Sequence, residues 1–305
     1  MSESNRGTLK YVAETTFNTT PSNSANWKHV EFTGESLSAT VNTTESAGIR
    51  ADRMLSDMPK VSTQVAGGVD FELSPSSFDD WIEAALCGTW TSNVLKVGTT
   101  KRSFSMEKGF EDLGVYQSFT GMRVGQMSLA TTYGSIITGS FQFTGAGSAQ
   151  LGTSLVGTGS VANAVADVFN STSDVGSVTI DGSSTGICIN SLNLDVNNNL
   201  REINCIGQEF ANDISYGSAS VTGSVELYLS AETWALYGNV LANTEVAISY
   251  TVSNGTDSYT FLLPKVKLSG DTPPIGGKDQ DVMITFNFSA LYDDTTGTNI
   301  QITRV

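Results

Sequence analysis

The chain has 305 residues, enough for two domains of ordinary size or for one large β domain. It is rich in Gly, Ser and Thr and poor in Pro, a composition that suits many short strands joined by tight turns. Its net charge of −15 argues against ordinary nucleic-acid binding, which uses Lys and Arg to neutralise phosphate; it suits solubility, or a surface that lies near DNA without holding it.

The first half is predicted to consist of antiparallel strands interrupted by one long loop. Residues 27–41 and 65–73 alternate between apolar and polar side chains, as half-buried strands do. The stretch between them, residues 42–63, is polar and charged, and we expect a long loop or an extended hairpin without a core of its own. Loops of this length are usually functional or are ordered by a partner.

A short helix is predicted directly after the second of these strands. Ser74 can cap this helix and Pro75 suits its first position. Phe78, Trp81 and Leu86 then recur on one face, with the spacing of an amphipathic helix. The remaining strands of the first half are expected at residues 101–108, 115–122 and 127–143.

The second half repeats this order of elements. A second helix is predicted to begin after Ser230, and a second long loop occupies residues 198–216. Asn254-Gly255 is a strong signal for a hairpin turn. Strands are expected at residues 191–196, 225–230, 245–253, 258–267 and 281–290.

The two halves look like copies of one β-rich unit. VDFELS at residues 69–74 matches VELYLS at 225–230, and GSFQF at 139–143 matches ITFNF at 284–288. We therefore predict two tandem domains, joined by a linker and a connecting strand. Such a duplication is more typical of assemblies than of catalysts. The predicted boundaries are 1–145 for the first domain, 146–186 for the linker and 187–305 for the second domain.

Motifs for catalysis or for a cofactor are not found in the sequence. His29 is the only histidine, and no GxSxG, HExxH, P-loop or GxGxxG pattern occurs in its proper context. The acidic pairs at 79–80 and 293–294 lack the spacing of a calcium loop and are expected to be solvated. We therefore expect no enzyme, no cofactor and no metal site. The aromatic residues of the two helices are expected to pack against the sheets: Phe78, Trp81, Trp234 and Tyr237.

The cysteines and the N-terminal sequence bear on where the protein is made. Cys87, Cys188 and Cys205 form no CxxC pair, and we expect buried free thiols in a reducing compartment. No apolar run follows Met1, and no apolar stretch is long enough to span a bilayer. The sequence therefore predicts synthesis in the cytosol, without a signal peptide and without contact with a membrane.

Segments spread over the first half resemble the tail tube proteins of long-tailed bacteriophages, especially those with non-contractile tails. The resemblance rests on the order and spacing of these segments, because it includes no catalytic motif. The second half of the chain matches in its pattern of elements more than in its residues. The segments are WKHVEFTGESL at 27–37, IRADR at 49–53, GGVDFELSPSSFDDWIEAAL at 67–86, SFSMEKG at 103–109 and FTGM at 119–122.

The resemblance implies two tandem antiparallel β-barrel or β-sandwich units, each with one short flanking helix. In this family the sheets of neighbouring units join edge to edge around a channel for DNA, usually with six units in a ring. Two units per chain would then give a trimeric, pseudo-sixfold ring, with a hexamer of whole chains as the alternative. Stacked rings would form the virion tail tube, in contact with a tape measure protein and a tail terminator, and DNA would pass without specific binding.

The resemblance also indicates which residues face the channel and which face the next ring. A channel wall of small polar side chains without Lys or Arg would repel phosphate mildly and let DNA slide. The candidates for this wall are Ser128, Thr138, Ser140, Gln142, Asn193, Asp195, Thr285 and Asn287. The candidates for contacts between rings lie in the two long loops and are Arg50, Asp52, Arg53, Asp57, Arg201 and Glu202.

Other functions stay open at this point. A soluble β-sandwich that binds a ligand or decorates the phage particle would show exposed aromatic pairs on loops and a stable monomer. A cell-wall hydrolase is disfavoured by the lack of a histidine or paired-acid motif. A tail terminator or a baseplate protein with the same fold would stop at one ring, whereas a tube protein would polymerise.

Overall fold

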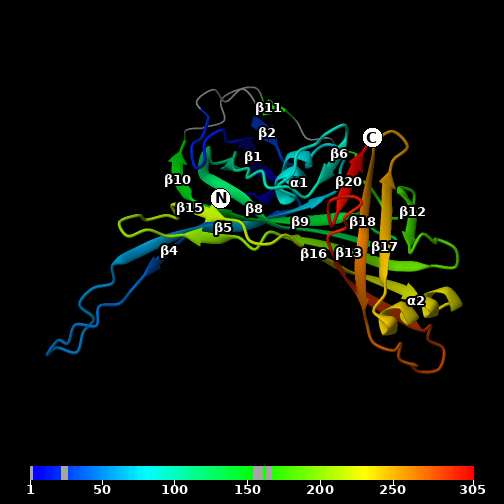
Figure 1. The fold of residues 1–305 in the computed structure, drawn as a ribbon. Coiled ribbons are helices and arrows are strands. Elements are labelled where there is room, and N and C mark those ends of the chain that lie inside the picture. The colour runs from blue at the N-terminus through cyan, green and yellow to red at the C-terminus, as the bar shows by residue number, and fades with distance from the viewer. Residues whose placement is uncertain (1–2, 22–26, 154–160, 163–166) are drawn as a thin grey trace.

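The computed structural model describes residues 3–21, 27–153, 161–162 and 167–305 (Figure 1). It is mainly β, as predicted, and its sheets form an open sandwich, so the barrel alternative is wrong. A 3-10 turn (Ser4–Arg6) precedes the strands, and the described helices are α1 (Asp79–Ala85) and α2 (Ala231–Ala242). The strands before the second half are β1 (Gly7–Ala13), β2 (Trp27–His29), β3 (Gly34–Glu35), β4 (Ser38–Thr43), β5 (Lys60–Glu72), β6 (Val94–Lys96), β7 (Phe104–Phe110), β8 (Val115–Thr132), β9 (Thr138–Gly145), β10 (Gly147–Gly152) and β11 (Val161–Ala162). Those of the second half are β12 (Val175–Ile180), β13 (Ile189–Asn197), β14 (Arg201–Ile203), β15 (Asp213–Ser215), β16 (Ser220–Tyr228), β17 (Glu245–Ser253), β18 (Ser258–Ser269), β19 (Met283–Ala290) and β20 (Gln301–Arg304).

One antiparallel sheet crosses the whole chain, and we call it the inner sheet. Its strands lie in the order β4, β5, β9, β8, β13, β16, β19, followed by the last residues of β18. β3 continues the line of β4 along β5. The junction between the halves is the pairing of β8 with β13, which runs from Gln126 opposite Asn197 to Thr132 opposite Ser191.

A second layer covers one face of the inner sheet in each half. In the first half it consists of β2, β1, β7, the start of β8, and β10. In the second half it consists of β12, β17, the start of β18, β20, and β6 from the first half. The long strands β8 and β18 belong to both layers, because each pairs with different neighbours along its length.

The same pairing order therefore recurs in both halves. The order β4–β5–β9–β8 in the first half corresponds to β13–β16–β19–β18 in the second, and we call these halves unit 1 (β1 to β10) and unit 2 (β12 to β20). β10 lies beyond residue 145 and pairs with β8 of unit 1. In the predicted linker, residues 154–160 and 163–166 lie outside the described residues.

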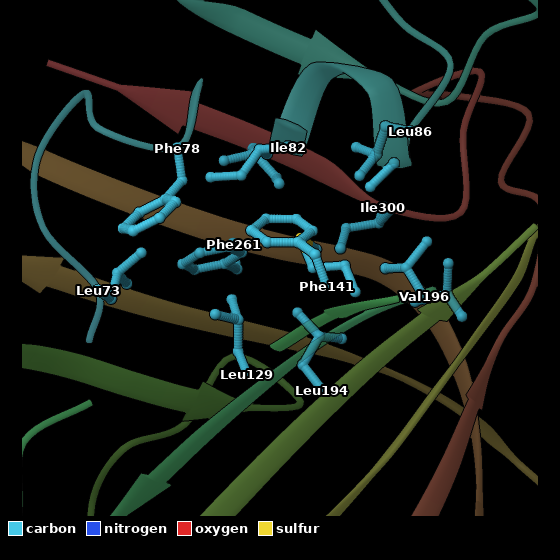
Figure 2. Packing of buried hydrophobic residues seen from close by; sticks show 14 of the residues in the cluster. Leu73, Phe78, Ile82, Leu86, Leu129, Phe141, Leu194, Val196, Phe261 and Ile300 are labelled. Carbon is cyan, nitrogen blue, oxygen red and sulfur yellow. The ribbon is translucent and has the colours of Figure 1, made fainter. Parts of the chain in front are cut away.

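The hydrophobic core is continuous through both units. Figure 2 shows Phe78 and Phe141 of unit 1 lining the same interior as Leu194 and Phe261 of unit 2. Trp81 lies at the centre of an aromatic cluster in unit 1, with ring centroids 4.9 Å from Tyr11, 5.0 Å from Phe143 and 5.4 Å from Phe141. These contacts hold α1 against the inner sheet.

The two helices begin differently from one another. α2 is capped as predicted, because Ser230 Oγ accepts from the N–H of Thr233 and the Thr233 side chain accepts from the N–H of Ser230. α1 begins later than predicted. Ser74 does not cap it; the Ser74 hydroxyl donates to Ser77, and the N–H of Ser76 donates to the hydroxyl of Tyr259 in unit 2, 2.9 Å away. The turn before α1 is thus used to contact the other unit.

Two further expectations need correction. Trp234 is 50% exposed, because α2 lies at one end of β17 and β18 and buries only Thr233 and Leu236 (Figure 1). Cys87 is buried, whereas Cys188 and Cys205 are exposed, so the prediction of buried thiols holds for one cysteine alone.

The predicted hairpin at 254–255 is present as a four-residue turn, since Ser253 pairs with Ser258 across it.

The two tryptophans provide a matched test of this packing. Trp81→Ala should lower the free energy of unfolding of the unassembled chain by about 3–5 kcal/mol, because it empties a fully buried site. Trp234→Ala should lower it by about 1 kcal/mol or less, because half of that side chain is already in water. Urea denaturation of both variants measures the difference, and equal losses would contradict the unequal burial.

Candidate assembly surfaces

The polar face of the inner sheet is formed by rows of paired side chains. Directly opposed residues of neighbouring strands share a face, so the pairs Asp70–Ser140, Ser140–Ser128 and Ser128–Asp195 form one row. A parallel row passes through Thr138 and Asn193. By the same pairings, all the predicted channel residues lie on this one face: Ser128, Thr138, Ser140, Gln142, Asn193, Asp195, Thr285 and Asn287. The opposite face carries the buried apolar side chains of the core.

A shallow hollow of about 480 Å³ lies in the middle of this polar face. Asp70 and Asp195 line it together with hydroxyl and amide groups. The Ser128 and Ser140 hydroxyls lie 2.8 Å apart, and Asn193 donates to Ser224 at 3.2 Å. Partial burial raises the pKa of the Asp195 carboxyl, and a hydrogen bond with Gln126 offsets this only in part. The face is acidic and polar, so it offers little attraction to a polyanion.

The inner sheet ends at β4 with an unpaired edge. β4 pairs with β5 on one side, its residues are largely exposed, and the structure describes no strand on its other side. The N–H of Ser36 donates to Gly68 of β5, and the N–H of Thr63 points away from β4 to Glu209. Since N–H groups alternate in direction along an antiparallel strand, those of Ala39 and Val41 face the open edge. This edge can accept a further strand.

The loop between β4 and β5 projects away from the body as an arm, residues 44–59 (Figure 1). Backbone hydrogen bonds join its two sides from Thr44 to Pro59 and from Ser46 to Asp57. Its apolar side chains are open to water: the exposed fraction is 102% for Ile49, and Met54, Leu55 and Met58 are more than half exposed. An exposed apolar surface of this kind marks an interaction site.

The predicted inter-ring residues of the first loop all lie in this arm. Arg50 and Asp52 form a bidentate ion pair with a shortest N–O distance of 2.6 Å. Arg53 has a positive φ at the tip, and Asp57 accepts from the N–H of Met58. Arg50 is therefore already paired within its own loop.

The second long loop is folded back onto unit 1 and forms the hairpin of β14 and β15. Glu209 in this loop accepts from the N–H and the hydroxyl of Thr63 and pairs with Lys60. Glu202 accepts from Gln64 at 3.3 Å, and Arg201 is exposed on β14. The sequence predicted equivalent roles for the two loops, but the structure holds one away from the body and packs the other against it.

Side chains of β18 and β20 join unit 2 to α1 of unit 1, and the sequence pattern gives no sign of these contacts. Asp79 on α1 accepts from the Tyr259 hydroxyl at 2.6 Å and forms an ion pair with Arg304. The Arg304 guanidinium lies 4.3 Å from the centre of the Trp90 ring. These residues are far apart in the sequence, so no local pattern could bring them together.

The described residues contain no group of three His, Cys, Asp or Glu side chains that could hold a metal ion. None of the described helices is long and apolar enough to cross a membrane. His29 lies on β2, where burial and the charge of Lys10 lower its pKa and the charge of Glu111 offsets this in part.

A comparison with known protein families matches residues 4–290 to a family described as phage tail tube protein. No curated protein matches the chain. The family match covers both units, including the polar face and the arm.

The raised pKa of Asp195 makes a prediction about stability and pH. The folded chain disfavours the charged carboxylate, so Asp195→Asn should raise the free energy of unfolding at pH 7. The gain should shrink as the pH falls through the raised pKa and vanish below the ordinary Asp pKa of about 3.9. Urea denaturation of the unassembled chain at several pH values measures this. The exposed Asp294→Asn variant is the control, and no gain for Asp195→Asn at pH 7 would contradict the effect of burial.

Proposed function

The chain belongs to the phage tail tube protein family, and from this we propose that it polymerises into stacked rings that form the hollow tail tube of a bacteriophage. Its role is structural, in the tail of the virion. The observation that carries the proposal is the inner sheet, which is continuous across both units and ends in an open edge at β4. The junction of β8 with β13 inside the chain is a template for the same junction between chains.

The ring we propose contains three chains and therefore six units. β13 of unit 2 occupies the place that β3 and β4 occupy in unit 1, and within the chain it is paired with β8. The strand of unit 2 that corresponds to β8 is β18, so β18 of one chain would meet β3 and β4 of the next. Three such joints would close a pseudo-sixfold ring.

The polar face of the inner sheet would line the channel. This orientation would leave the apolar core and both helices outside the channel wall, and Asp70 and Asp195 would then face the passing DNA. Carboxylates and small hydroxyl groups repel or ignore phosphate, so DNA would move along the channel without specific binding during ejection into the host.

The arm would join successive rings. Its apolar side chains have no cover in the described chain, and it projects well beyond the sheet (Figure 1). Burial of such a surface against a neighbouring ring is favourable by roughly 25 cal/mol for each Å² of apolar area. We further propose a long non-contractile tail, with a tape measure protein inside the tube and a terminator protein at its end.

The open edge of β4 gives the most direct test of ring formation. Ala39→Pro should leave the pairing of β4 with β5 intact, because the Ala39 N–H faces the open edge, and should remove a donor that the next chain needs. Negative-stain electron microscopy should show rings and tubes for the wild type and for Ala39→Ser, and unassembled chains for Ala39→Pro. Rings of normal yield from Ala39→Pro would contradict closure through this edge.

The arm gives a separate test of stacking. Ile49→Asp should leave the folded chain and single rings unchanged, because this side chain is fully exposed, and should reduce the length of tubes at least tenfold. Ile49→Leu, which keeps an apolar side chain, should form tubes of normal length. Tube length is measured in electron micrographs, and long tubes from Ile49→Asp would exclude this part of the arm from the contact between rings.

A further inference from the structure

Within the chain, the turn between β8 and β9 is hydrogen-bonded to an edge of unit 2. The N–H of Tyr133 donates to the carbonyl of Asn190, and the hydroxyls of Thr131 and Tyr250 lie 2.9 Å apart. Ser135 and Ser171 exchange hydrogen bonds of 2.9 and 3.1 Å. Only about 80 Å³ of open space is left between these elements. We call this turn the plug: its hydrogen bonds hold it against unit 2, while residues 132–136 stay exposed, with Tyr133 77% exposed.

The corresponding place on unit 1 is an open cleft of about 660 Å³. Residues 3–5, 7–8, 30–35 and 108–110 line it. The correspondence follows from pairing, because β1 lies beside β7 as β12 lies beside β17, and β3 lies beside β5 as β13 lies beside β16. Phe32 and the half-exposed Phe110 give the cleft an apolar part. Unit 1 therefore has the socket but no plug.

The corresponding plug of unit 2 is the segment 270–282 between β18 and β19. In unit 1, β8 continues to Thr132 between β9 and β13, whereas β18 stops at Ser269, which pairs with β19 on one side and with no described strand on the other. The segment is mostly exposed, and the exposed fraction of Ile275 is 93%. Figure 1 shows it at the opposite end of the molecule from β4, so it cannot reach the cleft of its own chain.

We propose that segment 270–282 of one chain docks in the cleft of a second copy of the chain, with Ile275 against Phe32 and Phe110. The inference rests on the proposed ring and names the contact that closes it. Ser269 pairs with Asn287 as Gln126 pairs with Gln142, so Gly270 is equivalent to Met127. Met127 pairs with Val196, and the position equivalent to Val196 in unit 1 is Ala39. Gly270 would therefore lie opposite Ala39 of the next chain.

The charges of the plug and the socket agree with this docking. By the same count, Lys278 is equivalent to Ser135. Ser135 is hydrogen-bonded to Ser171, and the residues of unit 1 equivalent to Ser171 are Glu3 and Ser4, at the rim of the cleft. Glu31 also lines this rim, and Glu35 deeper in the cleft is paired with Lys108. An exposed lysine on the plug would therefore meet a rim with exposed carboxylates.

The prolines of the segment fit the same register. Pro273 and Pro274 cannot donate a backbone hydrogen bond, so they interrupt a ladder. In the proposed register Pro273 falls opposite Ser36, in the break between β3 and β4 of the next chain, and Pro274 falls opposite Glu35, the last residue of β3. The interruption on one chain thus meets the interruption on the other.

Photo-cross-linking tests the docking directly. The full-length chain, carrying p-benzoylphenylalanine in place of Ile275, is assembled, irradiated and digested, and the adducts are mapped by mass spectrometry. The proposal predicts links between chains, with adducts in residues 3–8, 30–35 or 108–110. The same group in place of Thr256, in the exposed turn between β17 and β18, is the control and should form no such links.

The outcomes separate the docking from the proposed function. Rings or tubes whose links from position 275 lie elsewhere would overturn the docking and leave the tube function standing. A chain without rings or tubes in electron micrographs would contradict the tube function, and the docking would fall with it. As a second measurement, Lys278→Glu should raise the concentration needed for half-assembly roughly fivefold, and adding Glu31→Lys should restore it. An unchanged concentration for Lys278→Glu would contradict the charge contact.

Discussion

Backbone N–H and C=O groups at the edge of a sheet need partners, and β8 and β13 provide them for each other inside this chain. This pairing turns two units into one inner sheet and places every polar row on the same face. The two ends of the inner sheet lack such a pairing. β4 has one neighbouring strand in place of two, and β18 is shorter than β8. In the proposed ring, the exposed plug of one chain and the open cleft of the next would meet at the joint between chains.

The proposed ring contains two kinds of joint, one between the units of a chain and one between neighbouring chains, and these two joints differ. Inside the chain, β20 pairs with β6, and Asp79 binds both Tyr259 and Arg304. Unit 2 passes from α2 to β17 through residues 243–244, so it has no counterpart of β6 for a neighbouring chain to use. The joint between chains would therefore depend on the inner sheet and on the plug, and would be the weaker of the two.

Much of this arrangement could be predicted from the sequence, because strands with one buried face alternate in polarity whatever lies around them. Asn193 and Asp195 therefore lie together on the polar face of the inner sheet, as their alternation with the buried Leu194 predicts. The late start of α1 could not be predicted, because the hydroxyl of the distant Tyr259 binds Ser76 in the turn. The return of the second loop to Thr63 and the exposure of Trp234 likewise depend on contacts between distant segments.

The central claim is that the joint between β8 and β13 is repeated between chains, and the end-on symmetry of the assembled ring tests it most directly. Cryo-electron microscopy of isolated rings or tubes gives this symmetry and the number of chains per ring. The account predicts six similar lobes, true threefold symmetry and three chains in each ring. A ring of six whole chains with true sixfold symmetry would contradict it, because each chain would then contribute one unit to the channel wall.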